Sequence, residues 1–378
     1  MKGTITRRGK SSWRLKFDVG RDTSGKRKIR YVTVRGKRQD AERELAKQLS
    51  AFNDGIDVEP AKVAVADYLR QWLDAAKIAP KTLERYRQLA EQQIIPHLGS
   101  TAIQKLRPAQ IAAWHETLLR EGGKGGRPLS ARTVGHAHRV LHAALARAAA
   151  TEVVSRNVVG VIRTPKVEIE EVQILSASDV VGVLERTKNH PLGAIIALAL
   201  ATGARRGELL ALRWGDIDLD AGTLRIERSV EQTKTGVTFK SPKTRNGRRT
   251  ISLPPTAVDL LRTLRRDRLE LHLALGLGGD ISGALLFSTP EGAPISPNNL
   301  SRDWRRVVAA HGLPPVMFHA LRHSHASALI AAGMDPVTVS KRLGHGSPAV
   351  TLTVYAHLFQ KTDLAAASVI EAAMRGKA

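Results

Sequence analysis

The chain has 378 residues and no cysteine, and its 59 lysines and arginines against 35 aspartates and glutamates give a formal net charge of +24. This composition excludes disulfides, thiolate metal sites and a cysteine nucleophile, and its basic excess indicates a polyanionic partner, for which nucleic acid fits best. The longest apolar run, GAIIALALA from Gly193, is far shorter than the ~20 residues of a membrane span and predicts a buried helix. With a charged N-terminus and no signal core, we expect a cytoplasmic protein of two or three domains.

Residues 1–55 predict a small sheet with one helix. Apolar residues alternate from Trp13 to Val19, DTSG at Asp22–Gly25 is a turn signal, and a second β-rich run covers residues 28–34. Helical spacing of apolar residues begins after Asp40. The first 50 residues hold 16 basic and 5 acidic side chains, which favours a DNA-binding surface over a merely solvated basic face. The acidic stretch NDGIDVEP follows as a linker.

Residues 62–160 predict an all-helical domain. Helical spacing of apolar residues occurs in VADYLRQWL, PKTLERYRQLAEQQIIPHLG, RPAQIAAWHETLL and LSARTVGHAHRVLHAALARAAA. The last stretch contains His136, His138 and His142, and an i,i+4 histidine pair can bind a metal ion. Since no third ligand is near in the sequence, we favour contact with phosphate or solvent for these histidines.

Residues 170–378 predict the largest domain, made of helices, a hairpin signal and more helices. In TFKSPKTRNGRRTISL, Asn246-Gly247 is a strong hairpin-turn signal between β-forming residues, and it places Lys243 on the hairpin just before the turn. The C-terminal stretch QKTDLAAASVIEAAMRGKA is helical in pattern, which by itself fits a helix packed on its own domain; the family resemblance given below implies docking on a neighbouring protomer instead.

The stretch FHALRHSHAS places His319 and Arg322 one helical turn apart with no acid nearby. His319 and His323 have the spacing of a zinc pair, but Arg322 lies between them and the glutamate of an H-E-x-x-H site is absent. We therefore expect no metal, and we interpret His323 and His325 as helix-packing or DNA-contacting residues. No P-loop is present, so neither a cofactor nor nucleotide hydrolysis is expected.

Five segments together resemble the tyrosine recombinase family, with the closest likeness to integrases of phages and mobile elements. In chain order they are TGARRGELLALRW, PKTRNGRRTISL, FHALRHSHAS, LGHGSPAVT and VYAHL. The resemblance implies a multidomain fold: a small α+β N-terminal domain, an all-α core-binding domain, and a mainly α catalytic domain with a small β-sheet or hairpin. It also implies six site residues, which are Arg205, Lys243, His319, Arg322, His345 and Tyr355.

By this resemblance, Tyr355 would attack a DNA phosphodiester, giving a 3′-phosphotyrosyl bond and a free 5′-hydroxyl. Lys243 would protonate the departing 5′-oxygen, and His319 is a candidate acceptor of the tyrosine proton. The covalent bond preserves the phosphodiester energy, so rejoining would need no ATP.

The resemblance assigns the remaining residues to the phosphate. Arg205 and Arg322 would clamp the two non-bridging oxygens, because a guanidinium offers a planar fork of donors that matches them. His319 and His345 would donate further hydrogen bonds to the same oxygens. Glu208, three residues after Arg205, would either orient that arginine or form an ordinary surface pair with it.

The implied partner is double-stranded DNA, with core sites for the central domain and arm sites for the N-terminal one. Four protomers would assemble on two DNA sites and exchange strands through a Holliday junction, with a DNA-bending accessory protein as a further partner and no membrane. The protein would work in the cytoplasm, associated with the nucleoid. A type IB topoisomerase is the first rival, which the arm-like N-terminal segment disfavours. A non-catalytic DNA-binding regulator is the second, and it would not need the six polar residues.

Overall fold

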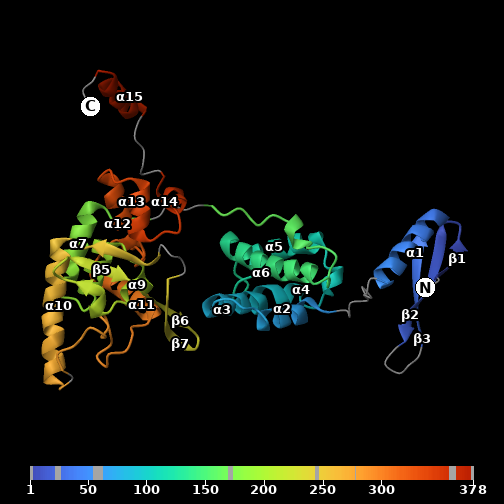
Figure 1. Ribbon diagram of the computed structural model, residues 1–378, viewed down its shortest axis with the longest axis horizontal. Helices are drawn as coiled ribbons and strands as arrows, with labels where there is room; N and C mark the ends of the chain where they lie inside the picture. Colours follow the sequence, from blue (N-terminus) through green and yellow to red (C-terminus); the bar gives the residue numbers. More distant parts are fainter. Residues whose placement is uncertain are drawn as a thin grey trace. The chain divides into compact units, whose positions relative to one another are not determined.

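The computed structural model describes residues 3–21, 27–53, 63–168, 173–242, 247–276, 278–356 and 363–375. The chain divides into two compact units, one formed by Met1–Ala76 with Tyr86–Lys166 and the other by Lys77–Arg85 with Val167–Ala378 (Figure 1). Each unit has hydrophobic cores of its own. The finer division expected from the sequence, into residues 1–55, 62–160 and 170–378, remains a prediction.

The first unit begins with an antiparallel sheet of strand order β1-β2-β3, followed by a helix. The elements are β1 Gly3–Gly9, β2 Ser12–Arg21, β3 Arg27–Arg35 and α1 Arg38–Asn53. Leu15 and Phe17 share one face of β2 and are buried with Ala41, so α1 covers that face of the sheet (Figure 1). The expected strands and helix are confirmed, whereas β1 was not expected because its second half is charged. The turn expected at Asp22–Gly25 and the acidic linker after α1 lie outside the described residues.

The rest of the first unit is helical, as expected from the sequence. Its main elements are α2 Val65–Asp74, the part of α3 Pro80–Leu89 that begins at Tyr86, the π-helical turn η1 Ala90–Ile94, α4 Ile95–Leu98, α5 Pro108–Glu121 and α6 Ala131–Ala150. The second predicted helix is therefore continuous but widens ahead of Pro96. Proline has no amide hydrogen and its ring clashes with the carbonyl four residues before it, and a π turn relieves that conflict. Trp114 and Leu141, on facing helices, are part of the shared core.

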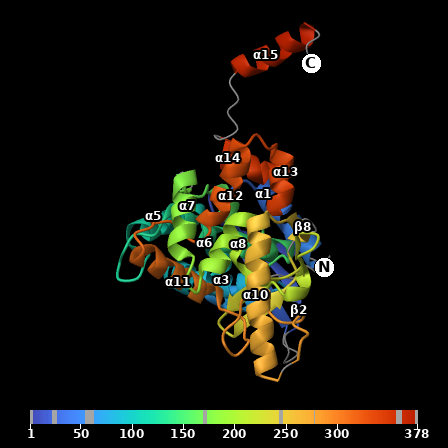
Figure 2. The same ribbon diagram turned by 90° about the vertical axis from the view of Figure 1, so that its left-hand side faces the viewer.

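The second unit places a small sheet among helices. Its helices are α7 Ala177–Thr187, α8 Gly193–Thr202, α9 Arg206–Leu209, α10 Pro255–Ala274, α11 Pro297–Ala310, α12 Ala320–Ala331, α13 Pro336–Leu343, α14 Pro348–Tyr355 and α15 Asp363–Met374. The expected buried helix from Gly193 is confirmed as α8, whose Ile196 and Leu198 are fully buried. In both views α12, α13 and α14 lie together, while α10 runs along another side of the unit (Figures 1 and 2). No helix among the described residues is long and apolar enough to cross a membrane.

The strands of the second unit correct the hairpin prediction. They are β4 Ile217–Asp218, β5 Thr223–Ile226, β6 Ser229–Thr233, β7 Gly236–Lys240 and β8 Arg249–Ser252. The strands that flank Asn246-Gly247 do not pair with each other, because β7 pairs with β6 whereas β8 pairs with β5. Pro242 cannot donate to a strand ladder, and Ile251 of β8 is buried opposite Leu224 in the core. Lys243 and Asn246, where the sequence predicted the hairpin lysine and its turn, lie outside the described residues.

Candidate active site

The turn after α8 sets the position of Arg205. Gly203 ends α8 in the left-handed region at φ 63°, and a side chain there would meet the His325 ring at 2.5 Å and Leu343 at 2.8 Å. Only glycine fits, because the backbone conformation and the close neighbours both exclude a Cβ. Arg205 then begins the short helix α9 as its N-cap.

Glu208 holds Arg205 in place from within the protein. Its carboxylate accepts hydrogen bonds from the Arg205 guanidinium at 2.8 Å, from the Arg205 amide at 2.9 Å and from Arg249 Nη2 at 2.8 Å. Burial by itself raises the pKa of Glu208, but the hydrogen bond and charge of Arg249 and the charge of Arg205 outweigh it and hold the pKa below its usual value. Glu208 is 3% exposed, so the surface-pair alternative is wrong and the salt bridge expected with Arg205 is confirmed, while its orienting role stays a prediction.

Arg249 was missed by the sequence analysis, and it links three segments. Besides Glu208, its guanidinium donates to the carbonyl of Arg342 at 2.7 Å and to that of Gly247 at 3.1 Å. The Arg205 guanidinium donates to the carbonyl of Gly344, two residues beyond Arg342, at 2.9 Å. The two arginines thus join α9, β8 and the end of α13 around one carboxylate.

Arg322 is buried in the first turn of α12 and is 3% exposed. Its Nη1 donates to the carbonyl of Gly203 at 2.7 Å, whereas its Nη2 is buried and has no hydrogen-bond partner among the described residues. Burial and the charge of Arg205 lower the pKa of Arg322 to about 9, so it stays cationic at neutral pH. A buried cationic donor without an acceptor is costly, and an anionic ligand would satisfy it.

Two histidines flank the arginines. His319 lies at the N-terminal end of α12 and is exposed, whereas His345 follows α13 and contacts Thr351 Oγ1 through its Nδ1 at 2.8 Å. Although part of the His319 side chain is exposed, desolvation by the surrounding protein, followed by the charges of His323 and the nearby arginines, lowers its pKa to about 4. Desolvation and the charges of Arg322 and Arg205 lower that of His345 to about 4. Both imidazoles are neutral at pH 7, and an anionic phosphate beside them would raise these pKa values.

Tyr355 is the last residue of α14 and is 2% exposed. Its hydroxyl lies 2.5 Å from Nδ1 of His323, a residue that the sequence analysis had assigned to packing or DNA contact. Burial raises the pKa of Tyr355 to about 12, although the charge of Arg322 opposes the shift. The hydroxyl is therefore protonated at neutral pH and meets an imidazole directly.

His325 fits the packing interpretation. Its ring hydrogen-bonds the carbonyl of Leu200 through Nδ1 at 2.7 Å, and its Nε2 accepts from Arg342 Nε at 3.1 Å. Because a carbonyl only accepts, Nδ1 carries the proton and the ring is neutral. Burial lowers its pKa to about 4, in agreement with that tautomer.

A cavity of ≈330 Å³ adjoins Arg205 and Glu208, with Ser229, Lys240, Pro242, Gly247, Gly344 and Gly346 in its wall. A second, of ≈680 Å³, has Arg205 and His319 in its lining. Lys243 lies outside the described residues, but Pro242 and Gly247 on either side of it line the first cavity. Lys240, also in that wall, forms an ion pair with Glu231.

Five of the six expected site residues thus lie in the described part of the chain and come together. Arg322 interacts electrostatically with Arg205 and Tyr355, and both His319 and His345 interact with the two arginines. Arg205, Arg322 and His345 are far apart in sequence, and the packing of α8 and α13 against α12 joins them. Among the described residues no cluster of three His, Cys, Asp or Glu could hold a metal ion.

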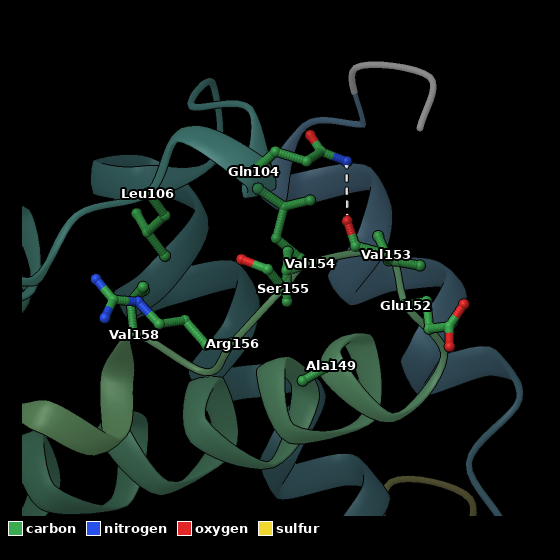
Figure 3. A pocket seen from close by; sticks show the side chains of 10 residues that line it. Gln104, Leu106, Ala149, Glu152, Val153, Val154, Ser155, Arg156 and Val158 are labelled. Atoms are coloured by element: carbon green, nitrogen blue, oxygen red, sulfur yellow. Dashed lines mark hydrogen bonds between the residues drawn. The ribbon is translucent and has the colours of Figure 1, made fainter. Parts of the chain in front are cut away.

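One of the three histidines singled out in the first unit corrects the expectation of phosphate or solvent contact. His138 is buried and its Nδ1 lies 3.1 Å from Nε2 of His115. His136, beside Arg139, and His142 are both exposed, which agrees with solvent contact. A cavity of ≈730 Å³ in the same unit is lined mainly by aliphatic side chains, with the Gln104 amide directed to the Val153 carbonyl (Figure 3). It presents none of the expected site residues.

Comparison with known proteins agrees with this geometry. The phage integrase family model matches residues 168–362, and the model of the phage integrase N-terminal SAM-like domain matches residues 64–119. An integrase of Streptomyces ambofaciens is 30% identical over 358 residues, covering 91% of this chain and 88% of the relative. A tyrosine recombinase XerC-like protein of Caldanaerobacter subterraneus subsp. tengcongensis is 28% identical over 381 residues, covering 95% and 96%.

Solved structures show the same fold. The Tn1549 transposon integrase in complex with a circular intermediate DNA has a TM-score of 0.69 at 22% identity, covering 82% of this chain and 99% of that one. A lambda integrase tetramer bound to a Holliday junction has a TM-score of 0.55 at 22% identity, covering 91% and 96%. The arrangement is the multidomain, mainly helical fold of tyrosine recombinases. This chain belongs to the phage integrase family and is a DNA breaking-and-rejoining enzyme, a site-specific recombinase.

Proposed function

We propose that Tyr355 is the nucleophile that cuts DNA, forming a 3′-phosphotyrosyl bond and releasing a 5′-hydroxyl. Arg205 and Arg322 bind the non-bridging oxygens of the scissile phosphate, with the unpartnered Nη2 of Arg322 as the observation that carries this assignment. That nitrogen needs an acceptor, and a phosphate oxygen supplies one while adding negative charge beside a buried cation.

His319 and His345 complete the phosphate site as hydrogen-bond donors, each through a ring N–H. Fixed donors aimed at developing charge contribute about 3–4 kcal/mol each to stabilising a transition state. Lys243 protonates the leaving 5′-oxygen, and this role is supported by Pro242 and Gly247, the described residues on either side of residues 243–246, which line the cavity beside Arg205. Neither a metal ion nor a cofactor takes part in this scheme.

The test is adduct formation on a nicked duplex, which traps the covalent intermediate. Tyr355→Phe should retain DNA affinity and form no protein–DNA adduct. Tyr86→Phe, which keeps its ring stacked on Trp72, is the matched control and should form the adduct at the parental rate. Adducts at parental yield in Tyr355→Phe would place the nucleophile elsewhere.

We further propose a homotetramer on two DNA sites, exchanging strands through a Holliday junction to integrate or excise a mobile element. The protein works in the cytoplasm on nucleoid DNA, and a DNA-bending protein assists assembly. Helix α15 supports assembly because its Ile370 and Met374 are 59% and 79% exposed, apolar side chains suited to a neighbouring protomer. The alternative, a type IB topoisomerase activity, predicts relaxation of supercoiled plasmid by monomers without recombinant products.

A further inference from the structure

The hydroxyl of the proposed nucleophile has one hydrogen-bond partner among the described residues. It is His323, on α12, whose Nδ1 lies 2.5 Å from Tyr355 Oη, with the ring centroids 5.7 Å apart and the ring planes tilted by 58°. The tyrosine hydroxyl has a single proton, and the nitrogen facing it is a ring nitrogen that accepts when unprotonated. The contact joins two segments 32 residues apart, so it is set by the packing of α12 and α14.

The surroundings of His323 favour the accepting form. Burial and the charge of Arg322 lower its pKa, which keeps the imidazole neutral at pH 7. Burial has the opposite effect on Tyr355, because it raises the pKa of the hydroxyl and so makes the hydroxyl harder to deprotonate. A buried phenol that must attack phosphorus needs a group to take its proton as the new bond forms.

We propose that His323 is a catalytic residue, the general base that takes the Tyr355 proton during DNA cleavage. The inference rests on the proposed role of Tyr355 as nucleophile. The hydroxyl proton passes to Nδ1 of His323 while the phenolic oxygen bonds to phosphorus, and the bond from phosphorus to the 5′-oxygen breaks as that oxygen takes a proton from the proposed acid Lys243. On rejoining, the 5′-hydroxyl attacks and returns its proton to Lys243, the tyrosine oxygen leaves, and His323 returns the proton to it.

His319, which the sequence made a candidate for this proton, is placed for a different task. Its ring stands perpendicular to that of His323 with centroids 4.8 Å apart, and it lines the cavity that adjoins Arg205. The hydroxyl contact belongs to His323, which therefore separates the two roles: His319 serves the phosphate and His323 serves the nucleophile.

Glutamine at position 323 tests the base directly. His323→Gln offers an amide oxygen that accepts the hydroxyl hydrogen bond but cannot take the proton. Single-turnover adduct formation should fall at least ~10²-fold, the usual loss of a missing acid or base, and His323→Ala should fall as far. A purely structural hydrogen bond predicts instead that glutamine restores the parental rate while alanine does not.

A second test of the general base uses a more acidic phenol as the nucleophile. With 3,5-difluorotyrosine installed at position 355, the ratio of parental to His323→Gln rates should shrink at least ~10-fold, because an acidic phenol depends less on a base. His319→Gln should show no such relief, since its loss is at the phosphate. Because the parental and His323→Gln rates are compared with the same residue at position 355, any effect of the fluorinated tyrosine on folding is common to both rates.

The outcomes separate this inference from the role of Tyr355. A His323→Gln variant at the parental rate, or one whose defect is the same with both nucleophiles, overturns the proposal for His323 and leaves Tyr355 as nucleophile. Adducts formed by Tyr355→Phe would instead remove the nucleophile itself. The His323→Gln defect should also persist on DNA with sulfur at the 5′-bridging position, because that change relieves only the need for a leaving-group acid.

Discussion

Arg322 is almost completely buried, yet one of its guanidinium nitrogens, Nη2, has no hydrogen-bond acceptor among the described residues. One guanidinium nitrogen is committed to the Gly203 carbonyl, which fixes the side chain, and the other has no partner in the described part of the chain. Burying a polar group without a partner costs stability, so this arrangement makes sense where a ligand completes it. A lysine can supply one of these contacts but not both, because its charge is a point and not a fork.

We therefore expect Arg322→Lys to cleave DNA at least ~10-fold more slowly, the scale of one hydrogen bond to a charged group. DNA affinity should change little, since many other phosphate contacts remain. The measurement is single-turnover adduct formation beside a binding titration. Arg302→Lys, at a half-exposed arginine paired with Asp303, is the control and should match the parent. Near-normal cleavage by Arg322→Lys would argue against the phosphate clamp.

At the scale of elements, Glu208 is the junction of the site. It gathers Arg205 from α9 and Arg249 from β8, and Arg249 continues to the carbonyl of Arg342 at the end of α13. The Arg249 side chain is 7% exposed, and the Glu208 carboxylate is its ion-pair partner. Removing one partner of a buried ion pair is far more costly than the net contribution of the pair.

Glu208→Gln should lower the unfolding free energy of the second unit by about 3 kcal/mol and slow cleavage as Arg205 loses its anchor. Asp216→Asn is the matched control, because it breaks another buried pair, with Arg228, that does not include Arg205. It should destabilise the unit while leaving cleavage intact in protein that remains folded. Equal cleavage by the two variants would show that Glu208 is structural only.

Glu208 should also contribute a pH dependence to the folding stability. Its folded pKa is depressed, so its stabilisation is present above the unfolded value of about 4.3 and is lost as pH falls through the lower folded value. Glu208→Gln has no such group, so the part of acid destabilisation that comes from this carboxylate should disappear in that variant. Calorimetric unfolding between about pH 6 and pH 3, a range that spans the unfolded value, measures the difference.

For the molecule as a whole, the net charge of +24 favours binding to the polyanionic DNA backbone. The N-terminal sheet illustrates it: Arg14 and Lys16 of β2 point away from the face that α1 covers, and Arg14 stacks over Tyr31 on that outer surface. Basic side chains beside an aromatic ring suit a surface that contacts nucleic acid.

Deleting residues 1–55 should flatten the dependence of log affinity on log salt for long DNA with arm sites, by about 0.9 for each phosphate that the shortened protein no longer neutralises. Cleavage of short core-site DNA should survive. A DNA without arm sites serves as the control, and its salt dependence should be the same for both proteins. An unchanged slope on the long DNA would show that this segment does not bind it.

Much of the fold was determined by local sequence. The alternation from Trp13 to Val19 predicted β2, and the apolar run from Gly193 predicted α8, because each pattern has the period of its element. The prediction of a hairpin at Asn246-Gly247 was wrong, because a local turn signal does not determine which strands pair. A turn signal says that the chain bends, while strand pairing is decided by which side chains reach the core, and Ile251 reaches it beside Leu224.

The site residues, like the fold, were predicted in part from the sequence and decided in part by the tertiary structure. The resemblance of five motifs to the tyrosine recombinase family, in the family's order, was enough to propose Arg205, Lys243, His319, Arg322, His345 and Tyr355, and phosphate chemistry, which needs cations, donors and a nucleophile, supports each role. Only the tertiary structure decided which contacts form. The contact of His323 with Tyr355 and the bond of Arg249 to Glu208 span 32 and 41 residues, and no pattern of spacing predicts them. They depend on how helices and strands pack, which sets angles and distances that a one-dimensional pattern does not carry.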